Sequence, residues 1–148
     1  MTYNKIRHLE LLKRFLDFKK QGKNLYTENR GEYMELLEYR CALYHHLFWK
    51  RKKQFVLLME NYTDNSIDIE QFEDAFSQLW SETMKVYNRF KIDLKELKNF
   101  ELDSKSDNFG IFITAVFRQF EILEDEECTE QEIKAYVENT LREIQPYL

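Results

Sequence analysis

The chain contains three copies of a local pattern that marks the beginning of an α-helix. In each copy a short polar residue is followed three positions later by Gln or Glu, and an apolar pair flanks both. The copies are Ile67-Asp68-Ile69-Glu70-Gln71-Phe72, Ile92-Asp93-Leu94-Lys95-Glu96-Leu97 and Cys128-Thr129-Glu130-Gln131-Glu132-Ile133. The polar side chains can accept hydrogen bonds from N–H groups that the first helical turn leaves unpaired, and the apolar pair packs across the turn. We therefore expect helices to begin after Asp68, Asp93 and Thr129.

Apolar residues recur at spacings of three and four along most of the chain, which is the period of an amphipathic helix. The spacing predicts a first helix from Ile6 that ends at Gly22, and helices over 68–90 and 133–144. Another apolar stripe predicts a helix that opens near Asp107. The segment 32–62 is either one long helix or two helices broken near its basic residues.

Turn-forming residues are scarce, because the chain has only three Gly and one Pro. A β-sandwich or barrel of this length needs many more of them. The fold class is therefore predicted to be all-α, a helical bundle in a single domain of 148 residues. We expect a helical-bundle core over 55–148 and additional N-terminal helices over 1–54. No apolar run approaches the ~18 residues of a membrane span, so no membrane partner is expected.

Charge is distributed unevenly between the two parts of the chain. Residues 1–60 carry 13 Lys and Arg against 7 acidic residues, whereas residues 61–148 carry 9 against 20. The basic part contains the stretch His45-His-Leu-Phe-Trp-Lys-Arg-Lys-Lys53. If this stretch bound nucleic acid, Trp49 would stack on a base and four cations would contact phosphates. These cations are Lys50, Arg51, Lys52 and Lys53. Four consecutive helical positions point in four directions, however, which favours a solvated helix rim.

The acidic counterpart lies between the last two predicted helices. Its candidate partner-binding residues are Glu121, Glu124, Asp125, Glu126, Glu127 and Glu130. One interpretation is a helix–helix loop that carboxylates keep hydrated. The other is a surface that presents fixed carboxylates where a cationic nucleic-acid-binding protein expects phosphates.

The remaining reactive residues indicate no chemistry. His45 and His46 are adjacent, so their side chains would not converge on a metal ion. Cys128 precedes a helix start whose dipole would lower its thiol pKa slightly, but its simpler role is to pack against Ile133. No P-loop, Gly-x-Gly-x-x-Gly fingerprint or Ser/His/Asp spacing occurs. The sequence thus predicts a non-enzymatic protein with no catalytic residue, cofactor or metal.

Two lone cysteines favour a reducing compartment, and no secretory signal is visible, so we expect a cytoplasmic protein. The abundance of Lys, Asn, Phe, Tyr and Glu is also typical of AT-rich coding genomes. The stroma of an organelle, with the gene encoded in a plastid, is therefore the alternative location.

From about residue 55 to 145 the chain resembles the colicin D immunity family of small helical bundles. Ser66-Ile67-Asp68-Ile69-Glu70-Gln71-Phe72 is similar to that family's "K-I-T-x-x-E-F" turn, and Phe112 to Glu121 is similar to its apolar helix ending in "E-R-F-E". The resemblance implies a four-helix bundle that occludes the basic active-site cleft of a tRNA-cleaving toxin with acidic side chains. Glu121 matches an acidic position of the motif, whereas Arg118 reverses the charge of its first glutamate.

The leading hypothesis is therefore an immunity or antitoxin-like protein that binds a basic ribonuclease-type toxin domain through its acidic surface. The first alternative is an RNA-associated protein that uses residues 45–53 together with cations of the predicted first helix, Lys5, Arg7, Lys13 and Arg14. The second is a structural or adaptor protein that keeps the fold without a toxin partner.

Overall fold

The computed structural model describes residues 2–148. Over these residues the chain is 79% helical, with eight α-helices and no strand. The helices are α1 (Lys5–Lys20), α2 (Leu25–Glu28), α3 (Arg30–Lys50), α4 (Lys52–Thr63), α5 (Ile69–Phe90), α6 (Leu94–Lys98), α7 (Phe109–Glu124) and α8 (Glu130–Glu143). Two short 3₁₀ helices follow α6 and α8, η1 (Ser104–Ser106) and η2 (Gln145–Tyr147). The predicted all-α class is confirmed.

The helix starts predicted after Asp68, Asp93 and Thr129 are confirmed. Asp68 and Gln71 form a complete capping box before α5, and Thr129 and Glu132 form one before α8. Asp93 also caps a helix, but α6 has only 5 residues. The segment 32–62 is two helices, because α3 and α4 are separated by the single residue Arg51. We call this break with its four cations, Lys50, Arg51, Lys52 and Lys53, the basic bend.

The start of α7 differs from the expected position near Asp107. The helix begins at Phe109, and the preceding Asn108 has a left-handed backbone with φ 61° and no capping hydrogen bond from its side chain. Its place is set instead by contacts with α3, described below. These contacts join residues far apart in the sequence, so no local pattern marks them.

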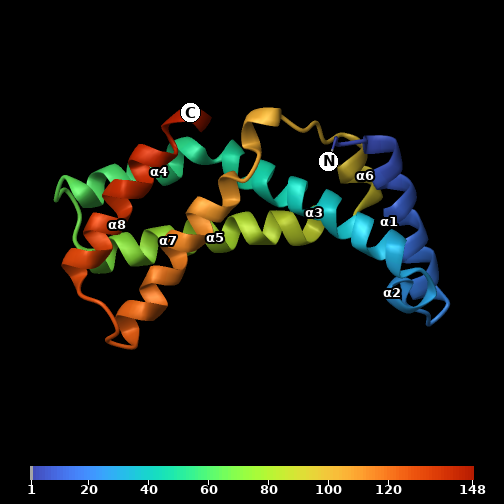
Figure 1. The fold of residues 1–148 in the computed structure, drawn as a ribbon, viewed down its shortest axis with the longest axis horizontal. Coiled ribbons are helices and arrows are strands. Elements are labelled where there is room, and N and C mark those ends of the chain that lie inside the picture. The colour runs from blue at the N-terminus through green and yellow to red at the C-terminus, as the bar shows by residue number, and fades with distance from the viewer. Residues whose placement is uncertain (1) are drawn as a thin grey trace.

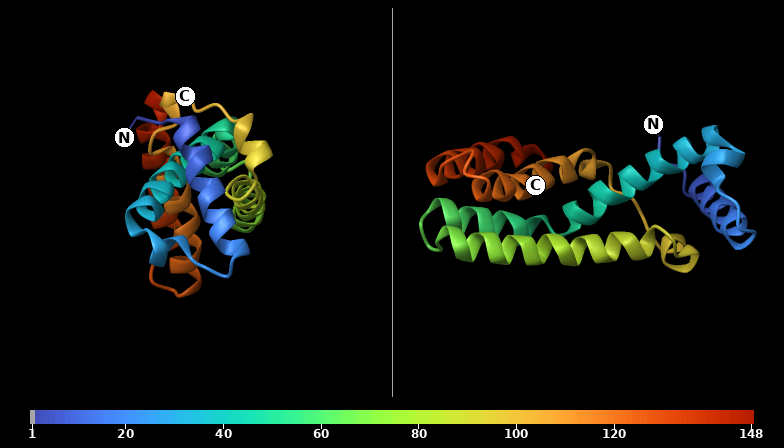
Figure 2. Two further views of the ribbon diagram at one scale, coloured as in Figure 1. Left: turned by 90° about the vertical axis from the view of Figure 1, so that its right-hand side faces the viewer. Right: turned by 90° about the horizontal axis from the view of Figure 1, so that it is seen from below.

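The molecule is elongated, with two helical groups joined by long helices (Figure 1). At one end α4, α5, α7 and α8 lie side by side as a bundle. At the other, α1 and α2 pack against α3, and α6 lies against α1 and α5 (Figure 2). Because α3 and α5 extend from one group toward the other, they fix the separation between the two ends.

The largest hydrophobic core lies among α3, α4, α5, α7 and α8. It is rich in aromatic residues: Phe72 stacks on Tyr62 with ring centroids 4.5 Å apart, and Phe76 packs edge-on against Phe120 at 5.7 Å. Phe48 of α3 is fully buried in the same core. Two smaller clusters continue along α3, one around Leu43 and one around Leu36. Thus α3 contributes to every core of the molecule.

Candidate functional site

The predicted acidic residues lie together at the turn that joins α7 and α8. We call this set the acidic turn: Glu121, Glu124, Asp125, Glu126, Glu127 and Glu130. Figure 1 shows the turn projecting from the bundle on the side away from the C-terminus. All six side chains are exposed. None of the salt bridges within residues 2–148 involves any of the six, so their charge is directed to solvent.

Backbone hydrogen bonds fix the conformation of the acidic turn. After α7, the N–H of Glu126 donates to the carbonyl of Leu123 and that of Glu127 to the carbonyl of Ile122, both at 3.0 Å. This pair of bonds is a Schellman motif, which closes the end of a helix. The capping box at Thr129 then begins α8. The carboxylates are therefore carried on a defined backbone, not on a long flexible loop.

The start of α5 adds acidic residues that the sequence did not point to. Glu73 lies beside Glu124 of the acidic turn, and burial together with this neighbouring carboxyl raises the pKa of Glu73. Asp74 and Glu70 act in the same direction. Their acidity was visible in the sequence, but the contact between α5 and the end of α7 depends on tertiary packing. The negative surface therefore covers the end of α7 and the beginnings of α8 and α5.

The acidic turn opposes the preferences of the helix that carries it. Glu121 and Glu124 lie at the C-terminal end of α7, where the helix dipole is negative, and the last turn has no basic residue. Glu126 has a left-handed backbone with φ 57°, a conformation that favours Gly. Residues that break local preferences often serve a function at some cost in stability.

Replacing Glu126 with Gly should therefore stabilise the protein by about 0.5 to 1 kcal/mol, because Gly adopts the left-handed conformation without steric cost. Urea denaturation at neutral pH measures the change. Asn65→Gly is the matched control, since Asn65 occupies the equivalent position after α4 with φ 67° and Asn tolerates that conformation. Equal effects of the two substitutions would contradict strain at Glu126.

Cys128 does not have the lowered thiol pKa that its position before α8 suggested. Desolvation, followed by the charges of Glu132 and Glu127, raises its pKa instead. Burial is the largest of these causes, so the slight lowering of the pKa that the helix dipole led us to expect is not found. The side chain packs against the main core, in keeping with the predicted apolar role.

The basic bend does not assemble into one cationic face. Arg51 is directed to α5, where it pairs with Glu82 at 3.6 Å. Lys52 lies over the ring of Trp49, 3.6 Å from its centroid, and burial followed by the charge of Lys53 lowers the pKa of Lys52. The indole N–H of Trp49 donates to the carbonyl of Tyr147 at 2.8 Å. One face and one edge of this indole are therefore occupied.

The cations of α1 that were grouped with the bend lie in the other helical group, and two of them are paired internally. Arg7 donates to the carboxylate of Glu35 at 2.9 Å, and Arg14 pairs with Glu32 at 3.0 Å. Lys5 lines a groove described below. The structure therefore does not combine these residues with the basic bend into a single surface.

His45 and His46 each accept a hydrogen bond from backbone that follows α6, in the first turn of α7 or in the connection that leads to it. The Nδ1 atom of His46 accepts from the N–H of Asp103 at 3.2 Å, and that of His45 accepts from the N–H of Gly110 at 3.1 Å. The two rings thus serve different partners. His46 is 3% exposed and packs edge-on against Phe100.

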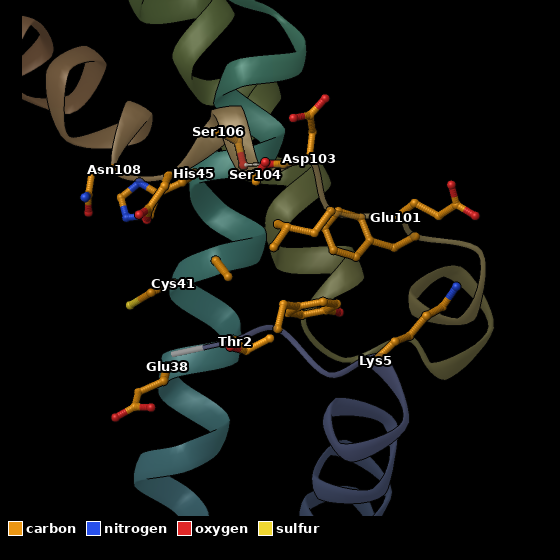
Figure 3. A pocket seen from close by; sticks show the side chains of 15 residues that line it. Thr2, Lys5, Glu38, Cys41, His45, Glu101, Asp103, Ser104, Ser106 and Asn108 are labelled. Atoms are coloured by element: carbon orange, nitrogen blue, oxygen red, sulfur yellow. Dashed lines mark hydrogen bonds between the residues drawn. The ribbon is translucent and has the colours of Figure 1, made fainter. Parts of the chain in front are cut away.

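A groove of about 1230 Å³ runs beside His45, and no pattern in the sequence indicated it. It lies between α3, the N-terminal segment and residues 100–108. Figure 3 shows Cys41 and His45 on one side of it, with Glu101 and Lys5 on the other. Because Nδ1 of His45 accepts a hydrogen bond, Nε2 carries the hydrogen of the neutral ring. His45 therefore presents a donor and is not arranged to take a proton from the Cys41 thiol.

Within residues 2–148, no helix is both long enough and apolar enough to cross a bilayer. No protein-family profile, curated protein or solved structure matches the chain.

Proposed function

We propose that this is a non-enzymatic binding protein whose acidic turn enters the basic cleft of a protein partner. The observation that carries the proposal is the acidic turn itself, with six exposed carboxylates, no salt bridge within the described chain and a backbone fixed on both sides. Opposite charge on a partner would relieve the repulsion between these groups and would steer association.

The partner class that we propose is a ribonuclease-type toxin domain. A nuclease active site must attract phosphates, so its cleft is positive, and a carboxylate-bearing projection can occupy it in place of RNA. The resemblance of residues 55–145 to the colicin D immunity family points to the same class. Arg118 lies one turn before Glu121 on α7, and its charge reversal would shift specificity to a toxin other than that of the family.

Binding to a purified tRNA-cleaving colicin-type nuclease domain tests the proposal, with inhibition of tRNA cleavage as the second readout. We expect an affinity that falls steeply between about 50 mM and 500 mM salt, since exposed charges are screened over about 10 Å at 0.1 M. Neutralising Glu124, Asp125, Glu126 and Glu127 to their amides should weaken binding at low salt by about tenfold or more.

A variant with the same change in charge elsewhere is the matched control. Glu28, Glu38, Glu60 and Glu101 are also exposed and form no salt bridge within residues 2–148, and they lie outside the acidic turn. Their amide substitutions should leave affinity within about twofold of the unaltered protein. Equal weakening by both variants would show that net charge, and not the acidic turn, governs binding. If no basic nuclease were bound, the adaptor alternative would be favoured.

The geometry does not favour the RNA-binding alternative. Stacking a base on Trp49 requires a free indole face, and Lys52 covers one face while the N–H edge is bound to Tyr147. Arg51 is paired with Glu82. Two exposed lysines of the bend, Lys50 and Lys53, remain for phosphate contacts.

A further inference from the structure

The connection between α6 and α7, residues 99–108, is joined to α3 through imidazoles. Within residues 2–148, one hydrogen bond joins α3 to this connection, from the N–H of Asp103 to His46. A second lies just beyond the connection, from the N–H of Gly110 in the first turn of α7 to His45. The connection's other hydrogen bonds are local: Ser106 donates to the carbonyl of Asp103, and the N–H of Lys105 donates to the Asp103 carboxylate. Two neighbouring histidines therefore provide the polar attachment of the connection and of the helix start that follows it.

Buried apolar side chains hold the connection mainly at its two ends. Phe100 is 6% exposed at one end, and Phe109 is fully buried just beyond the other. Between them only Ser106 is buried, and the remaining side chains are exposed or half-buried. Moving this middle part would expose little apolar surface, which is the condition for local opening without global unfolding.

We propose that residues 99–108 form an acid-releasable strap, held on α3 by the unprotonated Nδ1 atom of His46 at Asp103 and, just beyond its end, by that of His45 at Gly110. An imidazolium has a hydrogen on both nitrogens and cannot accept a hydrogen bond. Protonation of the two rings removes both attachments at once. The strap also forms one wall of the groove beside Cys41, so its release changes the shape of that groove.

The charged groups around the two rings decide when they protonate. Burial lowers the pKa of His45, and Asp107 on the strap partly opposes this. Burial, then Lys50, and finally Lys52 lower the pKa of His46 to about 4, against the opposing charge of Asp103. Glu38 and Lys5 line the groove with His45, whereas Glu96 and Glu101 line a smaller cavity with His46.

The sign of the effect follows from these shifts. Each histidine binds a proton less readily in the closed strap than in the open one, where its pKa returns toward the ordinary value of 6.5. Acid therefore favours the open strap, and the stabilising effect of the neutral rings is lost as pH falls below 6.5. For His46 this loss extends down to about pH 4. At pH 7 both rings are neutral and the strap is closed.

Amide hydrogen exchange followed by NMR tests the proposal on the whole chain. Between pH 7 and pH 5, after correction for intrinsic exchange rates, the protection of the Asp103 amide should fall by about twentyfold through His46 alone. The amide of Gly110 should also lose protection. Core amides such as those of Phe76 and Met59 should keep a higher protection than either at both values of pH.

Two substitutions separate the histidines from other groups that titrate. In His45→Asn and His46→Asn the amide oxygen can accept the same hydrogen bond and does not protonate. At pH 5 the first variant should therefore keep the Gly110 amide protected, and the second the Asp103 amide. Asp103→Asn tests the carboxylate and should leave the pH dependence in place. Loss of strap and core protection in parallel, or a twentyfold loss that persists in His46→Asn, would overturn the proposal.

Discussion

Between pH 7 and pH 5 the free energy of unfolding should fall by about 4 kcal/mol, because two histidines are buried in their neutral forms. His8 and His46 are 0% and 3% exposed, and each has a buried ring nitrogen, Nε2, without a hydrogen-bond partner among residues 2–148. Burial, with Arg40 as the second cause, lowers the pKa of His8 to about 4. The pKa of His46 is lowered to about 4 by burial and nearby lysines.

The unfolded chain binds protons at these two positions near the ordinary histidine pKa of 6.5, whereas the folded chain does so only near 4. Stability is therefore fully present above 6.5 and declines between 6.5 and 4, by about 2 kcal/mol for each histidine at pH 5. The carboxylate of Glu35, whose pKa is lowered by its bond with Arg7, contributes to acid sensitivity only below its ordinary value of 4.5.

Urea denaturation at pH 7, 6 and 5 measures this effect. His8 stacks on Tyr39 and its Nδ1 atom pairs with the hydroxyl of Tyr3 at 2.9 Å, so His8→Asn keeps an acceptor at that site without the titration. The double variant with His46→Asn should be less stable at pH 7 and should lose most of the pH dependence down to 5. His45, whose pKa burial also lowers, accounts for the remainder. If the double variant kept the full pH dependence, the buried histidines would not be its cause.

Gly110→Ala should destabilise the protein by about 3 kcal/mol. A Cβ atom at this position would lie 2.6 Å from Cε1 and 2.9 Å from Cδ1 of Tyr44, and 3.0 Å from Nδ1 of His45. The Tyr44 ring cannot easily move aside, since its hydroxyl is bonded to Thr114 and its face packs on Phe48. Overpacking of this kind costs about 1 to 3 kcal/mol, and displacing α7 would also stretch the bond to His45.

Gly31→Ala is the control for the substitution itself. A Cβ atom there meets only Asn29 Oδ1, at an ordinary 3.6 Å, in the first turn of α3. Because Ala favours helix over Gly, this variant should be neutral or more stable by up to about 1 kcal/mol. Denaturation midpoints of the two variants measured side by side give the comparison. Similar midpoints would show that α3 and α7 do not require the close approach at Gly110.

Local chemistry made much of the fold predictable from the sequence. The caps at Asp68 and Thr129 satisfy backbone groups within a few residues, so their signal does not depend on the rest of the chain. The break at Arg51 and the short length of α6 are set by tertiary packing. The start of α7 depends on Gly110 lying against Tyr44, a contact between residues 66 positions apart that leaves no local pattern.

The candidate site likewise combines features that follow from the local sequence with features that depend on tertiary packing. The acidic turn was predictable because its six residues are close in sequence and hydrophilic. The contribution of Glu73 was not, since it requires α5 to lie beside the end of α7. Adjacent histidines beside a basic run can indicate a metal or nucleic-acid site. In the structure, however, His46 binds the backbone N–H of Asp103 and His45 binds that of Gly110. Their sequence neighbours gave no indication of that role.

The course of α3 along the whole molecule bears on how the chain folds. Successive turns of this one helix pack into three hydrophobic clusters, through Leu36, Leu43 and Phe48. If α3 separated from any of the three clusters, apolar surface of that cluster would be exposed. Formation of one cluster around α3 therefore favours formation of the next. Folding of the N-terminal helices and of the bundle is thereby coupled, and the long axis of the protein acts as one cooperative unit.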